Sequence, residues 1–107
     1  MLDQLAREGL QSDRRYAETY LDSRARKGYG PVRIRQELRE RGIADSLIDE
    51  SLDASALDWT AVLAAVRDKK FGGAPPADFN ERARQSRFLQ YRGFSAEQIR
   101  RAYDTED

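Results

Sequence analysis

The chain has 107 residues, enough for one small domain or a short run of repeats, and its 19 basic and 19 acidic side chains give a formal net charge of zero. It contains neither cysteine nor histidine, which excludes disulfides, thiolate or histidine-based catalysis and the commonest metal ligands. No stretch approaches the roughly 18 apolar residues of a membrane span and no signal peptide opens the chain, so we expect a cytoplasmic protein without a membrane partner.

The first residues predict a short helix of their own. Leu2 and Leu5 would form its apolar side, and Gly9 is suited to the left-handed position at which many helices end. Ser12 or Asp13 would then cap the next helix by accepting a hydrogen bond from a free backbone N–H group. We therefore place a helix boundary near residue 10.

Glycine and proline divide the following segment into three further helices. The helix after Asp13 ends at Gly28, and Pro31 supplies the fixed φ that suits the first turn of the next one. Gly42 ends that helix, and Asp45 is expected to cap its successor. No run alternates apolar and polar residues through four positions, so we predict no strand.

The second half of the chain carries clear helix-start signals. Asp58 and Asp78 each precede a helical pattern, and Ser95 with Gln98 forms a capping box before the last helix. The Gly/Pro stretch at 72–76 cannot continue a helix and is predicted to be a loop.

A repeat organises these helices. Leu38 and Gly42 recur as Leu89 and Gly93, at an offset of 51 residues, together with the apolar residues that follow them. The preceding helices align at an offset of 42, and the loop at 72–76 accounts for the difference. Units of this size bury little alone and become stable by stacking on neighbours.

These observations predict an all-α fold of tandem three-helix repeats, packed at near-right angles into a slightly elongated molecule. The repeats would span residues 11–55 and 56–107, the second with a loop insertion near 72–76. Residues 1–10 would be the last helix of an otherwise missing first repeat, and the leucines exposed by that loss (Leu2, Leu5 and Leu10) would be the route by which a monomer self-associates.

No candidate catalytic site emerges. Carboxylates such as Asp49 and Glu50 are adjacent on a predicted helix, and neighbours on a helix point about 100° apart, which makes neither an acid–base pair nor a metal cage. We therefore expect a protein that binds a partner, with no cofactor and no metal, rather than an enzyme.

Charge is segregated along the sequence. Residues 13–42 carry a net charge of +4, residues 43–66 of −5 and residues 67–101 of +5. Two basic segments at repeat spacing suit an acidic ligand, either nucleic acid or an acidic protein groove. The candidate partner-binding residues are the basic side chains near the two helix bends and the aromatic residue at each bend: Arg24, Arg26, Lys27, Tyr29, Arg33, Arg35, Arg39, Lys69, Lys70, Phe71, Arg84 and Arg87.

Two of these assignments have structural alternatives. Tyr29 and Phe71 would either stack on a ligand or close the corner between two helices.

A helix-turn-helix interpretation of the first repeat is disfavoured because its would-be recognition helix is acidic. In the second repeat, where Arg100 and Arg101 lie, this interpretation stays open.

The segments with the most distinctive residues resemble the RecX family: Ser12-Asp13-x-Arg15-Tyr16-Ala17, Tyr20-Leu21-x-Ser23-Arg24, and Lys27-Gly28-Tyr29-Gly30-Pro31 followed by Ile34, Glu37-Leu38 and Gly42-Ile43. The resemblance continues through Asp58-Trp59, Lys69-Lys70-Phe71 and Gly93-Phe94 and so covers essentially the whole chain. It implies three tandem three-helix repeats, of which the first is almost wholly absent here.

The resemblance also implies a function in DNA repair and the SOS response. RecX-like proteins regulate the RecA recombinase, so the implied activity is binding to the RecA–single-stranded DNA filament and inhibition of its ATPase and strand exchange. The alternative is a module that binds single-stranded DNA directly and competes for the recombinase's substrate.

Overall fold

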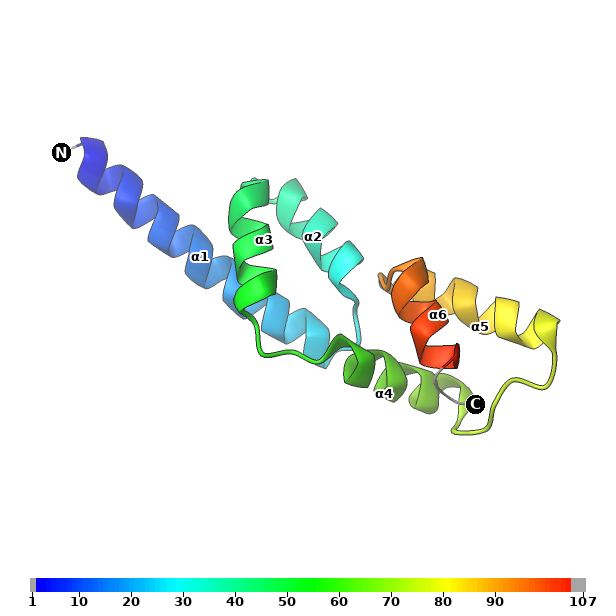
Figure 1. The fold of residues 1–107 in the computed structure, drawn as a ribbon. Helices are drawn as coiled ribbons and strands as arrows, with labels where there is room; N and C mark the ends of the chain where they lie inside the picture. Colours follow the sequence, from blue (N-terminus) through cyan, green and yellow to red (C-terminus); the bar gives the residue numbers. More distant parts are fainter. Residues whose placement is uncertain (1, 105–107) are drawn as a thin grey trace.

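The computed structural model describes the backbone of residues 2–104 and the side chains of residues 12–104. This part of the chain forms six α-helices and no strand (Figure 1). None of these helices combines the length and the apolar character that crossing a bilayer requires. The helices are α1 (Leu2–Arg26), α2 (Pro31–Glu40), α3 (Asp45–Ala54), α4 (Trp59–Phe71), α5 (Phe79–Arg92) and α6 (Ala96–Asp104).

The predicted boundary near residue 10 is wrong, because α1 runs without interruption from Leu2 to Arg26. A glycine inside a helix costs about 1 kcal/mol relative to alanine, which the strong helix formers around Gly9 can offset. Figure 1 shows the N-terminal half of α1 extending away from the other helices. The side chains of Leu2, Leu5 and Leu10 lie outside the described residues, and the assignment of 1–10 to a missing repeat stays a prediction.

Three of the predicted helix starts are confirmed. The carboxylate of Asp58 accepts hydrogen bonds from two N–H groups of α4, at 3.0 and 3.3 Å, and that of Asp78 accepts from Glu81 N at 2.8 Å. Ser95 and Gln98 form the expected reciprocal pair, at 2.8 and 3.1 Å. These bonds satisfy N–H groups that have no partner within the helix.

The predicted cap at Asp45 is wrong. Ala44 occupies the N-cap position of α3 and makes no side-chain cap bond. The Asp45 carboxylate instead accepts from the guanidinium of Arg39, at 2.6 and 3.0 Å. An arginine within reach therefore outcompetes the backbone for this carboxylate.

Two small cores confirm the tandem three-helix arrangement. Helices α1, α2 and α3 pack on one another, as do α4, α5 and α6. Trp59 is half-buried and packs against both cores, so it links them. The buried residues of the first core are Ala17, Leu21, Ile34, Leu38, Ile43, Leu47 and Ile48, and those of the second are Leu63, Val66, Leu89, Phe94, Ile99 and Tyr103.

The same turn ends the second helix of each unit. Ile43 N donates to Leu38 O at 3.1 Å, and 51 residues later Phe94 N donates to Leu89 O, also at 3.1 Å. The glycine before each donor has a positive φ, +83° in the first unit and +104° in the second. The offset predicted from the sequence is thus repeated in backbone geometry.

The units are joined by direct contact between two backbones, which we call the joint: residues 28–32 and residues 92–94. Gly30 N donates to Arg92 O and Val32 N donates to Gly93 O, each at 2.9 Å. A Cβ atom on Gly30 would lie 2.4 Å from Gly93 O. Only glycine allows this approach, so the joint fixes how the second unit sits on the first.

Candidate functional site

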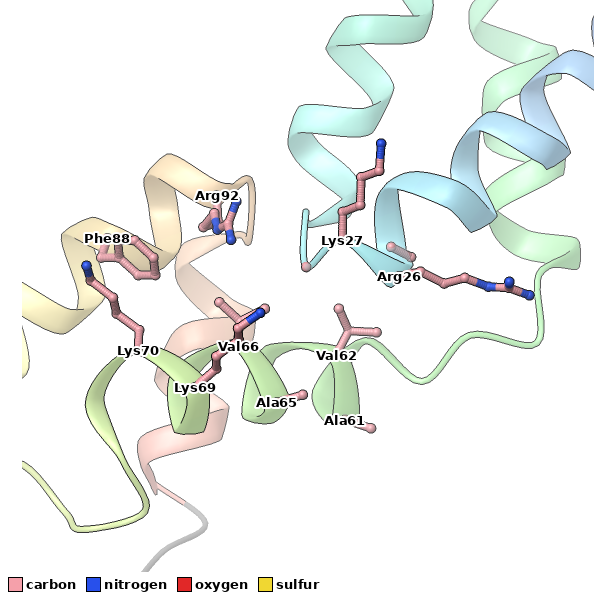
Figure 2. Close-up of a pocket in the computed structure, with 12 residues that line it drawn as sticks. Arg26, Lys27, Ala61, Val62, Ala65, Val66, Lys69, Lys70, Phe88 and Arg92 are labelled. Carbon is pink, nitrogen blue, oxygen red and sulfur yellow. The ribbon is translucent and has the colours of Figure 1, made fainter.

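A hollow with a mainly apolar lining runs between the end of α1 and one face of α4, with a volume of about 570 Å³. We call it the basic groove. Its floor is apolar, whereas the charged residues among its lining are all cations (Figure 2). None of the described residues that line it is acidic. The floor consists of Ala25, Gly28, Ala61, Val62, Ala65, Val66 and Phe88, and the rim of Arg26, Lys27, Lys69, Lys70 and Arg92.

The rim cations gather here because helices α1, α4 and α5 end here. Arg26 lies in the last turn of α1, Lys69 and Lys70 in that of α4, and Arg92 in that of α5. Cations in a last turn interact favourably with the partial negative charge of the helix C-terminus. The repeat therefore generates one cationic helix end after another, and the joint brings them to one place.

Most of this positive charge is available to a partner. Within the described part of the chain, no acidic side chain forms an ion pair with Lys27, Lys69 or Lys70. Arg26 pairs with Asp22 at 3.0 Å, but both side chains are exposed, and such pairs contribute about 0–1 kcal/mol.

Arg24 contacts Tyr29 of the joint and does not line the groove. Its guanidinium donates to both carboxylate oxygens of Glu37, at 3.1 and 3.0 Å, and the two side chains are only 19% and 18% exposed. Its Cζ atom lies 3.7 Å from the ring centroid of Tyr29, and those of Arg33 and Arg92 each lie 4.6 Å from it. Tyr29 also packs against the first core. These contacts support the corner-closing alternative for this residue.

The electrostatics of this cluster follow from its burial and its hydrogen bonds. Burial raises the pKa of Glu37, but hydrogen bonds from Arg24 and Tyr20 outweigh that effect and hold it below its usual value. Burial lowers the pKa of Arg24, and the hydrogen bond to Glu37 more than reverses this. The pKa of Tyr20 is raised by burial and by its hydrogen bond to Glu37. Glu37 is therefore a fixed anion that orders the cations around it.

The candidate arginines of α2 face acids of α3. Arg35 Nη2 lies 2.7 Å from Asp49 Oδ1, and Arg39 Nε lies 2.6 Å from Asp45 Oδ1. The basic and acidic blocks that are separate in the sequence are thus neighbours in space. Their charges balance, so the first unit presents less positive charge on this side than its sequence suggests.

In the second unit, the remaining candidates do not line the groove. Arg84 pairs with Glu81 at 2.7 Å, and Phe71 packs edge-on against Phe88 with ring centroids 5.4 Å apart. Arg87 is exposed and forms no ion pair with the described acids. Partner contact by Arg33, Arg35, Arg39, Arg84, Arg87 and Phe71 stays a prediction.

Four of the candidates, Arg26, Lys27, Lys69 and Lys70, come together at the groove. Sequence reasoning left out Arg92 as a site residue and missed the apolar floor. The available signal was the alanines at 61, 64 and 65, which lie one turn or more before Lys69 and Lys70 in the same helix. Among the described residues, no group of three or more acidic side chains is placed to hold a metal ion.

Comparison with known proteins agrees with this architecture. A model described as "RecX, second three-helix domain" matches residues 12–52, and one described as "RecX, third three-helix domain" matches residues 58–103. Proteins named "Regulatory protein RecX" are similar throughout. That of Halorhodospira halophila is 50% identical over 107 residues, and that of Pseudomonas entomophila is 50% identical over 106. These alignments cover 100% and 99% of this chain but 66% and 68% of the relatives, so the chain spans about two thirds of their length.

Proposed function

This chain belongs to the RecX family, and from that premise we propose that it is a regulatory module that binds the RecA–single-stranded DNA filament. Binding would lower ATP hydrolysis and strand exchange by the recombinase. The curated relatives carry the name "Regulatory protein RecX", which supports a regulatory role. The chain would regulate the recombinase by binding to the filament and would not itself catalyse a reaction.

The observation that carries the proposal is the basic groove. Cations from α1, α4 and α5 meet there, and the described acids leave Lys27, Lys69 and Lys70 without ion pairs. A filament of a recombinase on DNA repeats the same surfaces at regular intervals. An elongated chain of two units can contact neighbouring subunits at once, and such multivalency raises avidity without a single tight site.

The test is a titration against fluorescent single-stranded DNA, first bare and then coated by RecA with a non-hydrolysable ATP analogue, at near-physiological salt. RecA ATPase is measured in a separate reaction that contains ATP in place of the analogue. We expect binding to the coated strand, weak binding to the bare strand and a lower ATPase rate.

A matched pair of variants tests the groove. In the groove variant, Lys27, Lys69 and Lys70 are replaced by glutamine; in the control, Arg15, Arg100 and Arg101 are replaced instead, which removes the same charge from exposed positions elsewhere. Exposed ion pairs contribute about 0.2–1 kcal/mol each, so three lost contacts amount to about 0.6–3 kcal/mol. We expect filament affinity to fall by about 3-fold to 150-fold in the groove variant and much less in the control.

The outcomes separate the alternatives. Equal binding to bare and coated DNA, with a steep loss at higher salt, would favour the direct DNA-binding module. Binding to neither form, or an ATPase rate that stays unchanged at saturation, would overturn the proposal for this chain.

A further inference from the structure

The floor of the basic groove is suited to protein side chains. Ala61 and Ala65 are exposed and carry only methyl groups, so another backbone can approach α4 closely. Val62 lies beside them, and Val66 and Phe88 continue the apolar surface toward the end of α4 (Figure 2). An apolar side chain that lies on this floor removes apolar surface from water, which a phosphate group does not.

The aromatic content of the groove disfavours nucleic acid as its occupant. Phe88 is the one aromatic side chain among the described residues that line it. Its ring already contacts Phe71 edge-on at 5.4 Å, with Lys70 Nζ at 5.4 Å and Arg92 Cζ at 5.7 Å from the ring centroid. Single-stranded DNA is commonly held by bases stacked on free aromatic faces, and this groove offers no such platform among its described residues.

The rim cations specify the charge of the occupant. Arg26 and Lys27 lie at the end of α1, whereas Lys69 and Lys70 lie farther along the groove at the end of α4 (Figure 2). Cations at both ends of an apolar floor complement a segment whose apolar residues are flanked by carboxylates. Lysines with flexible stems can follow carboxylates at several positions.

We propose that the basic groove binds an acidic amphipathic segment of a protein partner, with its apolar side chains on the α4 floor and its carboxylates among the rim cations. The inference deepens the proposed function and rests on it in one respect, because it assigns that segment to the protein of the filament and not to its DNA.

The probes are three fluorescein-labelled molecules. The first is a synthetic helix-forming peptide of glutamate and leucine, with leucine at positions i, i+3 and i+7. The second has alanine in place of each leucine and the same charge. The third is an oligothymidine. We expect the wild-type chain to bind the leucine peptide at least about tenfold more tightly than the alanine peptide, equivalent to about 1.4 kcal/mol of apolar contact.

Adjacent alanines of α4 supply a matched pair of variants. Ala65→Asp places a carboxylate on the floor, where it repels an acidic occupant and wets the apolar surface. Ala64→Asp makes the same change at an exposed position that does not line the groove, with the same loss of helix propensity. Far-UV circular dichroism checks that both variants are folded. We expect Ala65→Asp to weaken binding of the leucine peptide by tenfold or more and Ala64→Asp to leave it within twofold.

The same variants separate this inference from the proposed function. If the chain binds the RecA-coated strand and Ala65→Asp weakens that binding, with the leucine peptide as a competitor, both stand. If filament binding persists equally in the two variants, or if oligothymidine and not the peptide competes, the inference is overturned while the proposed function survives. If the filament is not bound but the leucine peptide is, and only Ala65→Asp abolishes this, the groove chemistry stands and the assignment to the filament falls.

Discussion

Replacing Gly30 by alanine should separate the two units without unfolding either of them. Gly30 has φ −89° and ψ 170°, extended values that alanine adopts freely, so the substitution introduces no backbone strain. What it lacks is space, because the new Cβ atom would lie 2.4 Å from Gly93 O and 2.6 Å from Phe94 N. Both neighbours are backbone atoms and cannot turn aside as a side chain can.

The size of the stability loss follows from the distance by which Gly93 O must move. Ordinary van der Waals contact begins at 3.4 Å, so Gly93 O must move away by about 1.0 Å from its 2.4 Å position. The same displacement would lengthen the two joint hydrogen bonds from 2.9 Å to about 3.9 Å, beyond useful range. Each bond contributes about 0.5–1.5 kcal/mol. Together the two bonds contribute about 1–3 kcal/mol. The lower entropy of the unfolded alanine chain returns about 0.4–1 kcal/mol, which leaves a net loss of about 0–2.6 kcal/mol, centred on about 1.3 kcal/mol.

Urea denaturation followed by two probes measures this loss. Far-UV circular dichroism reports all the helices, whereas the fluorescence of Trp59 reports the place where both cores meet. In the wild type the two transitions should coincide. In Gly30→Ala the fluorescence transition should come at lower urea, because the units separate before they unfold.

Gly42→Ala is the matched control. Gly42 has φ +83°, which disfavours alanine by about 1–2 kcal/mol, but its surroundings are open, with nothing within 4 Å of an added Cβ. It should lower stability while the two transitions stay coincident. Coincident transitions in Gly30→Ala, with a midpoint equal to that of the wild type, would refute the steric argument for the joint.

Three further predictions concern side chains. Because the folded-state pKa of Glu37 is depressed, its contribution to stability is complete above its ordinary value of 4.5 and is lost as the pH falls through the lower folded-state value; urea midpoints should drop over this range in the wild type and less in Glu37→Gln. Arg24→Gln should cost about 1.5–3 kcal/mol in the same assay, since it leaves the Glu37 carboxylate short of its main partner. Asp58→Ala should cost about 1 kcal/mol in thermal melts, whereas Asp45→Ala, at a carboxylate that caps nothing, should stay within about 0.5 kcal/mol.

Much of the fold was predictable because its signals are local. A capping box such as Ser95 with Gln98 acts across three residues, and a left-handed glycine such as Gly93 ends a helix by its own backbone preference. The errors arose where a competing side-chain partner, or the summed helix propensity of many residues, decides the local structure. The Asp45 carboxylate accepts a hydrogen bond from Arg39 and so does not cap α3. Gly9 stays helical because strong helix formers lie on both sides of it.

The candidate site was less predictable because charge in a sequence says nothing about which opposite charge comes near it. Arg35 and Arg39 belong to a basic block of the sequence, yet in the fold they form ion pairs with acidic residues of α3. Arg24 looks like its basic neighbours in the sequence, and only the packing of α1 on α2 shows that Glu37 holds it. The lysines of the groove differ, because none of the acidic side chains that the structure describes forms an ion pair with Lys27, Lys69 or Lys70.

The joint and the basic groove share residues, so they are thermodynamically coupled. Gly28 lines the groove, and a Cβ atom there would lie 2.7 Å from Val66 Cγ2, a floor residue of the other unit. Arg92 accepts the joint hydrogen bond from Gly30 at its carbonyl and contributes its guanidinium to the rim. A ligand of the groove therefore binds only the docked arrangement of the two units and must stabilise it. A change that loosens the joint weakens the ligand by the factor by which it lowers the docked fraction. Gly30→Ala should accordingly reduce affinity for the leucine peptide although Gly30 does not itself line the groove, whereas Gly42→Ala should not.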